Sequence, residues 1–332
     1  MGERVMGRLC RRLLGISPAE TLVSRRGFAV PPPDVRDRLE TIGRSFLEGY
    51  HAALTDTRPE PLAARLDEVE PIFRGFAYEG AAMGLAIVDF LAPWRPRRVA
   101  RFLLGAGNAH AYMVHVGIGW AAARVPWVCR RLPRLLASLD PLLRWLVVDG
   151  YGFHQGYFHW QRFVRRQEPP RGLRGYATRA FDQGLGRSLW FVEGADPARL
   201  RRSIGAFAAD RQGDLWSGVG LASAYAGGVS AEVLSAVRES AGPFLPQLGQ
   251  GIAFAAKTRH RAGNPAAHTA AACRAIGGIS ADEAAALCDR TLLDLPPGDD
   301  QRPAYESWRQ RIQQRFPGGD EIRQSSPLAC DV

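Results

Sequence analysis

The chain has 332 residues, of which 46% are hydrophobic and 23% charged, and its formal net charge at pH 7 is +10. This length can bury a substantial core, and the composition excludes disordered and collagen-like proteins. Lys257 is the only lysine, and the arginines are scattered along the chain instead of forming blocks with aromatic residues. We therefore expect no nucleic-acid partner, whereas a basic surface would attract acidic partners such as acyl-carrier domains.

The five cysteines form no Cys-x-x-Cys pair, and the arginine-rich N-terminus lacks the apolar segment of a secretory signal. The best candidate for a membrane span, residues 75–94, contains Glu79 and Asp89 and has Pro93 near its end. A spanning helix needs about 20 mainly apolar residues, so this stretch does not qualify. These features predict a cytoplasmic protein with no membrane association.

Three regions follow one another along the chain. Residues 1–33 form an arginine-rich N-terminal arm that ends in three prolines. Residues 34–292 have almost no β-strand signal, because their apolar residues recur at spacings of three and four, and they predict an α-helical domain. Residues 293–332 begin as a linker rich in Pro, Asp and Gly, continue as one last helix over about 304–316, and end in a polar tail.

A helix centre with a glycine followed by small residues recurs seven times within the central region. The seven glycines are Gly49, Gly80, Gly117, Gly150, Gly184, Gly218 and Gly251, and their successive separations are 31, 37, 33, 34, 34 and 33 residues. A period near 34 is typical of a two-helix unit. The sequence therefore predicts an all-α protein with about seven two-helix units, arranged as an α-solenoid or an α/α toroid.

Small residues also stand two and four positions after most of these glycines, and these two positions lie on different faces of a helix. Glycine inside a helix costs up to about 1 kcal/mol relative to alanine. Close packing of each helix between two neighbours would offset this cost. We expect such packing at the seven helix centres.

The residue before the glycine is polar in six units of the seven. These residues are Glu48, Glu79, Asp149, Gln183, Ser217 and Gln250. Stacked units would align them as a polar ladder along a groove or a central cavity. Because the helical architecture does not itself require polar residues there, they are candidates for function.

The fourth unit has the densest set of reactive groups. Asp149, His154 and Tyr157 lie within about two turns of one helix. Arg187 stands three residues after the glycine of its unit, a position at which the other units have an apolar residue. A carboxylate, an imidazole and a phenol can transfer protons, so these four are the candidate catalytic residues. The candidate substrate-binding residues are Glu79, Gln183, Trp190, Phe153 and His115. A purely structural role for any of these histidines stays open.

The spacings do not indicate a metal site. His154 and His159 are five residues apart, a poor spacing for sharing a metal on a helix, and no zinc-binding motif is present. We expect no metal and assign no cofactor. A haem bound through His115 or His154 stays an alternative.

Several long segments together resemble one bacterial family. They are RRGFAV, FRGFAYEGAAMGLAIVDF, HAYMVHVGIGWA, DGYGFHQGYFHW, RAFDQGLGRSLWFVEGADP, DLWSGVGLASAYAGG and RAGNPAAH. The resemblance, from about residue 25 to 316, is to the UnbL-type family of unknown function met in enediyne polyketide gene clusters. It implies a role in converting a linear polyene from an iterative polyketide synthase into an enediyne core, and it brings no catalytic residues with it.

Two hypotheses follow from the residues and the resemblance together. In the first, the protein is an enzyme or enzyme subunit that acts on a polyene or on an acyl-carrier-bound intermediate. In the second, it is a non-catalytic helical-repeat scaffold that shields the polyketide intermediate or docks pathway enzymes. Convergence of His154, Asp149 and Arg187 in a closed apolar pocket would favour the enzyme.

Overall fold

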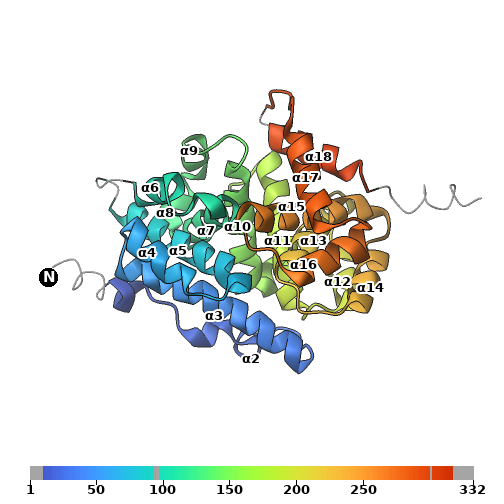
Figure 1. Cartoon of the computed structure of the whole chain (residues 1–332), viewed down its shortest axis with the longest axis horizontal. Coiled ribbons are helices and arrows are strands. Elements are labelled where there is room, and N and C mark those ends of the chain that lie inside the picture. The colour runs from blue at the N-terminus through green and yellow to red at the C-terminus, as the bar shows by residue number, and fades with distance from the viewer. Residues whose placement is uncertain (1–9, 93, 95–96, 300, 317–332) are drawn as a thin grey trace, which may run out of the picture.

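The computed structural model describes residues 10–92, 94, 97–299 and 301–316 (Figure 1), and all regular secondary structure in these ranges is helical. The all-α prediction is therefore confirmed for this part of the chain. The α-helices are α2 (Val23–Arg26), α3 (Pro33–Thr55), α4 (Pro59–Asp67), α5 (Pro71–Leu91), α6 (Arg98–Leu104), α7 (Ala111–Arg124), α8 (Pro126–Cys129), α9 (Leu132–Ala137), α10 (Arg144–Phe158), α11 (Tyr176–Val192), α12 (Pro197–Gly205), α13 (Ala209–Tyr225), α14 (Ala231–Ala241), α15 (Leu245–Arg261), α16 (Ala267–Ala272), α17 (Ala281–Leu292) and α18 (Ala304–Gln313).

Shorter helical segments of other types connect some of these helices. Three are 3₁₀ helices, namely η1 (Pro18–Thr21), η2 (Asn108–His110) and η4 (Gly242–Phe244). Two are π-helices, namely η3 (Gln161–Arg165) and η5 (Cys273–Gly277).

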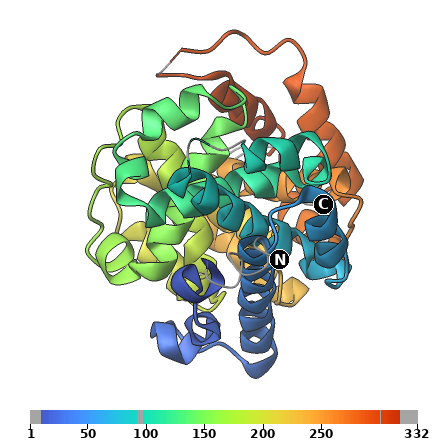
Figure 2. The ribbon, with the colours of Figure 1, turned by 90° about the vertical axis from the view of Figure 1, so that its left-hand side faces the viewer.

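Seven long helices form the frame of the molecule, and shorter elements connect them. They are α3, α5, α7, α10, α11, α13 and α15, and each contacts the next one in this order. Figure 1 shows α5 and α7 on the left, α10 near the centre, and α11, α13 and α15 to the right of it. In the turned view of Figure 2, α3 is the long blue helix in front, and the later helices lie around and behind it.

The first helices of this series also meet the last ones. Arg259 on α15 donates a hydrogen bond to the carbonyl oxygen of Ile72 at the start of α5 (3.1 Å), and the Asn264 amide donates one to Pro71 O (3.2 Å). Arg38 on α3 donates to the carbonyl oxygen of Ala226, directly after α13 (2.6 Å). The series therefore curves, and the inward faces of α5, α7, α10, α11, α13 and α15 enclose a common interior.

The glycines of the predicted helix centres lie at the contacts between successive long helices. A Cβ atom on Gly184 would overlap the carbonyl oxygen of Asp149 on α10, and one on Gly218 would overlap that of Gln183 on α11. Gly186 lies two residues further along α11. A Cβ on Gly186 would overlap the carbonyl oxygen of Leu215, which lies on the neighbouring helix α13. Each helix is thus held closely on both faces, as the small residues predicted.

Local signals explain several helix boundaries. Proline occupies the first turn of α3, α4, α5 and α12, where its missing N–H leaves no intrahelical bond unmade. Ser280 and Glu283 form a capping box at the start of α17, so that two otherwise unpaired backbone N–H groups gain partners. Gly27 ends α2 in the left-handed conformation, with φ of 66°.

The segment before α3 packs against the helical body. Arg26 donates hydrogen bonds to the carbonyl oxygens of Tyr157 (3.1 Å) and Phe158 (2.8 Å) at the end of α10, and Trp160 returns one to Arg26 O (3.0 Å). At the other end of the chain, the helix expected over about 304–316 is α18, Ala304–Gln313. Residues 1–9 of the expected arm and 317–332 of the expected tail lie outside the described residues.

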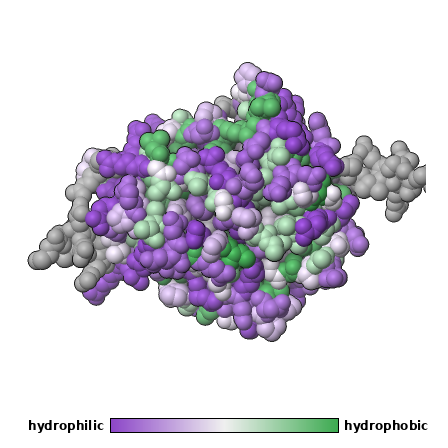
Figure 3. Space-filling view, viewed as in Figure 1, coloured by the Kyte–Doolittle hydropathy of each residue, from purple (hydrophilic) through white to green (hydrophobic). Residues whose placement is uncertain are grey.

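The surface in the view of Figure 3 is predominantly hydrophilic, with hydrophobic residues in small separate patches. Within the described ranges, no helix combines the length and the apolarity needed to cross a membrane.

Candidate functional site

Polar side chains from successive long helices form a hydrogen-bonded row in the interior. Gln183 Nε2 donates to Asp149 Oδ2 (2.8 Å), and Ser217 Oγ donates to Gln250 Oε1 (2.8 Å) and more weakly to Gln183 Oε1 (3.5 Å). All four side chains are buried. Each residue directly precedes a helix-centre glycine, so the close approach of the helices places these groups within hydrogen-bond distance of one another.

Arg187 is the charged partner of this row. Its Nη1 atom donates to Asp149 Oδ1 at 2.5 Å, and both side chains are almost completely buried. The guanidinium carbon lies 4.7 Å from the centre of the Phe153 ring, which adds a cation–π contact. Burial alone would lower the pKa of Arg187, but the nearby Asp149 and Glu79 carboxylates reverse this and raise it.

Helix α18 extends the row from outside the repeating segments. Arg309 is fully buried and donates to Gln250 Oε1 (3.0 Å), and it pairs with Asp214 (2.7 Å) and Glu306 (3.2 Å). Tyr305 on the same helix accepts a hydrogen bond from Gln183 (3.1 Å). A helix that is distant in sequence therefore supplies partners to the Gln250 and Gln183 side chains of the row.

An aromatic cavity of about 50 Å³ lies beside Glu79, which stands on α5. Its aromatic side chains are Phe46, Phe76, Trp120, Phe153, Tyr157, Phe158 and Phe191, and its other lining residues are Ile16, Glu20, Thr21, Ile42, Gly43, Leu47 and Glu79. The rings of Trp120 and Phe153 are 5.0 Å apart and meet edge to face. Such a volume holds about three or four water molecules or a short stretch of an apolar chain.

Glu79 is the most deeply buried carboxyl group of this cavity, at 1% exposure. Burial raises its pKa to about 7; the positive charge of Arg187 opposes this shift, and the negative charge of Asp149 adds to it. Its Oε1 atom has no hydrogen-bond partner within the described residues. Glu79 therefore presents a carboxyl group that can gain or lose a proton near neutral pH.

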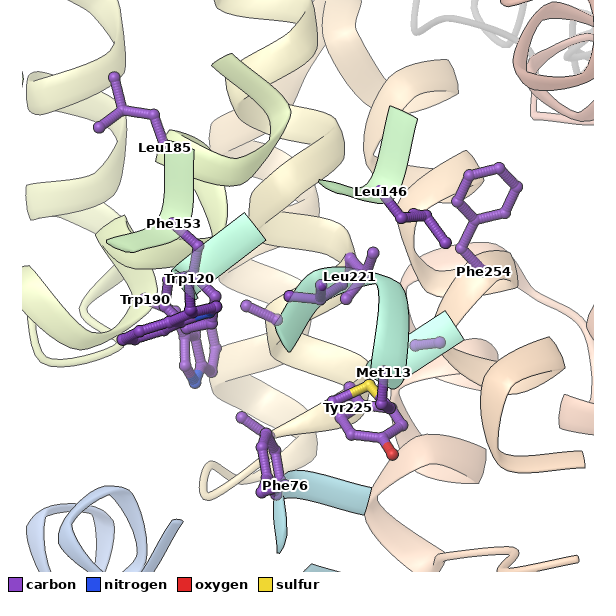
Figure 4. Packing of buried hydrophobic residues seen from close by; sticks show 14 of the residues in the cluster. Phe76, Met113, Trp120, Leu146, Phe153, Leu185, Trp190, Leu221, Tyr225 and Phe254 are labelled. Carbon is purple, nitrogen blue, oxygen red and sulfur yellow. The ribbon is translucent and has the colours of Figure 1, made fainter. Parts of the chain in front are cut away.

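A second cavity, of about 30 Å³, lies on the Arg187 side of the interior. It is lined by Tyr112, Met113, Val116, Leu146, Arg187, Leu221, Tyr225, Phe254, Lys257, Thr258, Tyr305 and Trp308. The Tyr225 ring packs against Phe76 of the aromatic cavity, with ring centres 5.1 Å apart (Figure 4). The wall between the two cavities thus includes Phe76 and Tyr225.

The sequence profile of one family, described as "Protein of unknown function (DUF1702)", matches residues 5–316. The chain belongs to the DUF1702 family. Comparison of this DUF1702 chain with curated proteins and with solved structures finds no match.

Of the candidate catalytic residues in this DUF1702 protein, Asp149 and Arg187 are brought together and His154 is not. His154 is buried among Trp120 and Phe158, with ring centres 5.4 and 4.8 Å away, and it lines neither cavity. Burial, together with the nearby His159 and arginines, lowers its pKa well below the usual range, so the ring is neutral. Tyr157 lines the aromatic cavity, and its hydroxyl donates to Glu20 O at 3.4 Å.

The candidate binding residues divide in the same way. Glu79 and Phe153 line the aromatic cavity, and Gln183 belongs to the buried polar row. Trp190 lines neither cavity and donates its indole N–H to Gly227 O (3.1 Å), which is a structural contact. His115 also lines neither cavity, and its Nδ1 lies 2.7 Å from Ala111 O on its own helix.

Several residues of the site were missed from the sequence, among them Trp120, Phe191, Phe76 and Tyr225. The signal for some of them was present in the column three residues after each glycine. Trp120 and Phe153 of this column line the aromatic cavity, and Arg187, Leu221 and Phe254 line the second one. That column therefore marks part of the inward face of the long helices.

The described residues contain no group of three or more His, Cys, Asp or Glu side chains placed to hold a metal ion. His115 and His154, the histidines considered for haem, line neither of the two cavities. Glu79 is the most deeply buried ionisable side chain that lines the aromatic cavity.

Proposed function

We propose that this protein is an accessory protein of enediyne or other polyketide biosynthesis that binds a linear polyene in the aromatic cavity and acts on it through Glu79. The observation that carries the proposal is a cavity with seven aromatic side chains and one buried, unpaired carboxyl oxygen. The resemblance to the UnbL-type family supports the pathway. In this proposal the protein works in the cytoplasm, on a polyketide intermediate that is free or bound to an acyl carrier.

The aromatic lining of the cavity suits a conjugated chain. A polyene is flat, apolar and polarisable, and aromatic side chains contact such a chain through their faces and edges. The rings of Phe153 and Phe191 lie 5.6 Å apart, and those of Phe46 and Trp120 lie 4.7 Å apart, so the walls come from several helices. A chain longer than the cavity would require these side chains to move apart.

Glu79 supplies the reaction in this proposal. As a carboxylate it removes a proton from one carbon of the bound chain, and as the resulting acid it returns a proton to another carbon. A double bond shifts along the chain, no atom is gained or lost, and no further reactant is needed. A group with a pKa near 7 is suited to both steps at neutral pH. Arg187, held by Asp149, stabilises the charged form of Glu79.

A non-catalytic function is the second candidate. The pairing of Asp149 with Arg187 and with Gln183 satisfies groups that the sequence suggested as catalytic. This observation favours a protein that shields a reactive polyene or docks pathway enzymes without changing the chain. The two candidates share the binding site and differ in the role of Glu79.

The architecture is part of the same proposal. We infer a helical repeat of about 34 residues, with about seven two-helix units in a curved α-solenoid or α/α toroid. One contact repeats from unit to unit and supports this arrangement. In it, the glycine of one unit lies against the backbone of the previous unit, at the carbonyl oxygen of the residue just before that unit's own glycine. This contact is made by Gly117, Gly150, Gly184, Gly218 and Gly251. In such an array the unit centres line the interior and therefore carry the site.

Binding is tested with cis-parinaric acid, a fatty acid with a fluorescent conjugated tetraene. We expect it to bind wild-type protein and to bind Phe153→Leu about tenfold more weakly, because one wall of the cavity is lost. Phe181→Leu is the matched control, since Phe181 is a buried phenylalanine on α11 that lines neither cavity. Equal affinity of both variants and wild type would contradict the binding site.

Catalysis is tested by co-expressing the polyene-forming synthase and its thioesterase with wild-type protein, with Glu79→Gln, or with neither. A shifted double bond leaves the mass unchanged, so products are compared by mass, by chromatographic retention and by visible absorption. A new product with wild type only, together with retained tetraene binding by Glu79→Gln, is the result expected for an enzyme. Unchanged products in all three cultures would overturn the enzyme and favour the shielding protein.

A further inference from the structure

A surface pocket of about 300 Å³ lies between η3 and α12. It is lined by Val164, Arg165, Gln167, Glu193, Arg199, Arg202, Ser203 and Ala206. Three arginines and one carboxylate line it, which leaves a net charge of +2 at this pocket. None of the residues proposed for polyene chemistry takes part in it.

Two of these arginines are available to a ligand. In the described part of the chain, the guanidinium groups of Arg199 and Arg202 make no hydrogen bond or ion pair, and both residues are exposed. Arg165 is half exposed, and its Nη2 lies 3.4 Å from Glu193 Oε1. Glu193 is buried and also accepts a hydrogen bond from Ser203 (2.6 Å), so its charge lies at the base and holds Arg165 in place.

The pocket is close to the aromatic cavity along the chain and in space. Glu193 comes two residues after Phe191, which lines the cavity. The Arg165 guanidinium lies 5.4 Å from the Trp160 ring, Trp160 packs against Phe28 at 6.4 Å, and Phe28 meets the cavity residue Tyr157 at 5.1 Å. A continuous series of side-chain contacts therefore joins Arg165 at this pocket to Tyr157 at the aromatic cavity.

We propose that this pocket binds the phosphate group of a carrier-bound substrate, that is, the phosphodiester through which a carrier protein holds its acyl chain. The inference rests on the proposed function and names the partner of the same site. Guanidinium groups bind phosphate oxygens through paired, charge-assisted hydrogen bonds, and a concave pocket with several of them suits one compact anion. The tethered chain would then extend from this pocket toward the aromatic cavity.

The test uses 4′-phosphopantetheine and pantetheine, which differ only in the phosphate group, titrated calorimetrically into the full chain. We expect phosphopantetheine to bind wild type at least about tenfold more tightly than pantetheine. In the double variant Arg199→Gln, Arg202→Gln this preference should disappear. Arg101→Gln is the matched control, since Arg101 is an exposed arginine on α6, distant from α12, and the preference should persist there (Figure 1).

Two results would overturn the inference: equal binding of the two compounds by wild type, or a preference that survives in the double variant. Tetraene binding is measured on the same proteins to separate this inference from the proposed function. Retained tetraene binding without a phosphate preference would disprove only the phosphate pocket and leave the proposed function standing. A phosphate preference without tetraene binding removes the aromatic cavity as the chain site, and with it the carrier role of the pocket.

Discussion

Arg187 and Asp149 form an ion pair of 2.5 Å between α11 and α10, with neither side chain more than 4% exposed. Asp149 also accepts a hydrogen bond from Gln183, and Arg187 packs over the Phe153 ring. Desolvation makes buried ion pairs costly, and the surrounding hydrogen bonds offset part of that cost. The pair fixes the Arg187 guanidinium at the wall of the second cavity, where its positive charge also acts on Glu79.

Removing one partner of this ion pair should lower the free energy of unfolding far more than replacing both partners with apolar residues. Arg187→Met leaves the Asp149 carboxylate buried without a counter-charge, and we expect a loss of about 3–5 kcal/mol in the free energy of unfolding. The double variant Arg187→Met, Asp149→Leu should lose clearly less, because no charge is stranded. Urea unfolding of the wild type, both single variants and the double variant measures this coupling. Additive losses would show that the pair is not energetically linked.

Glu79 should make the protein less stable as the pH rises. Burial raises its pKa to about 7, from 4.5 for an unperturbed glutamate. Between these values the folded state holds more protons than the unfolded state, so the free energy of unfolding falls with increasing pH, by about 3 kcal/mol in total. Glu79→Gln should remove this decline and be the more stable protein above pH 7. Urea unfolding between pH 5 and 8 measures both curves.

Glu60 provides the control for this experiment, because it is exposed on α4. Glu60→Gln should follow the wild-type curve over the whole pH range. A curve for Glu79→Gln that runs parallel to the wild type would contradict the assignment of the decline to Glu79.

Features that each helix centre carries by itself could be predicted from the sequence. The glycine and the polar residue before it lie on one short segment, so their spacing predicts both the close approach of Gly184 to Asp149 and the row that joins Asp149 to Gln183. The direction of His154 could not be predicted in this way. It depends on packing against the rings of Trp120 on α7 and of Phe158, whose centres lie 5.4 and 4.8 Å from the His154 ring.

Contacts between segments that are distant in the chain could not be predicted from the sequence pattern either. Arg309 follows the linker and belongs to no unit, yet it pairs with Asp214 and donates to Gln250. The aromatic cavity likewise combines Ile16 and Thr21 with residues of α10 and α11. No periodicity connects these positions, so only the folded chain reveals that they meet.

The helix-centre glycines should not tolerate even one added methyl group. In Gly184→Ala the new Cβ would overlap the carbonyl oxygen of Asp149, and α10 and α11 would have to separate. We expect a loss of about 1–3 kcal/mol despite the higher helix propensity of alanine. Gly205→Ala is the matched control, since nothing lies within 4 Å of a Cβ at the end of α12, and it should be neutral or stabilising by up to about 1 kcal/mol. The melting temperatures of both variants measure this difference in stability. Equal melting temperatures would contradict close packing at Gly184.

Helix α18 should contribute to the stability of the whole fold mainly through the side chain of Arg309. Arg309 is fully buried, and besides Asp214 and Gln250 it contacts Glu306 and Tyr176. Arg309→Met would leave these groups with a single remaining cation, Arg179, which reaches both carboxylates at 2.9 Å. We expect a loss of about 3 kcal/mol in urea unfolding, the lower end of the range for breaking a buried pair, because Arg179 compensates in part.

Arg315 serves as the control for α18, because it is an exposed arginine that follows the same helix. Arg315→Met should change the free energy of unfolding by less than about 0.5 kcal/mol. If α18 were only a surface attachment, its detachment would leave the core intact, and the two variants would unfold at the same urea concentration. A loss confined to Arg309→Met would instead mean that the last helix completes the buried polar row, because Gln250 would lose its hydrogen bond from Arg309 and Asp214 would keep only its ion pair with Arg179.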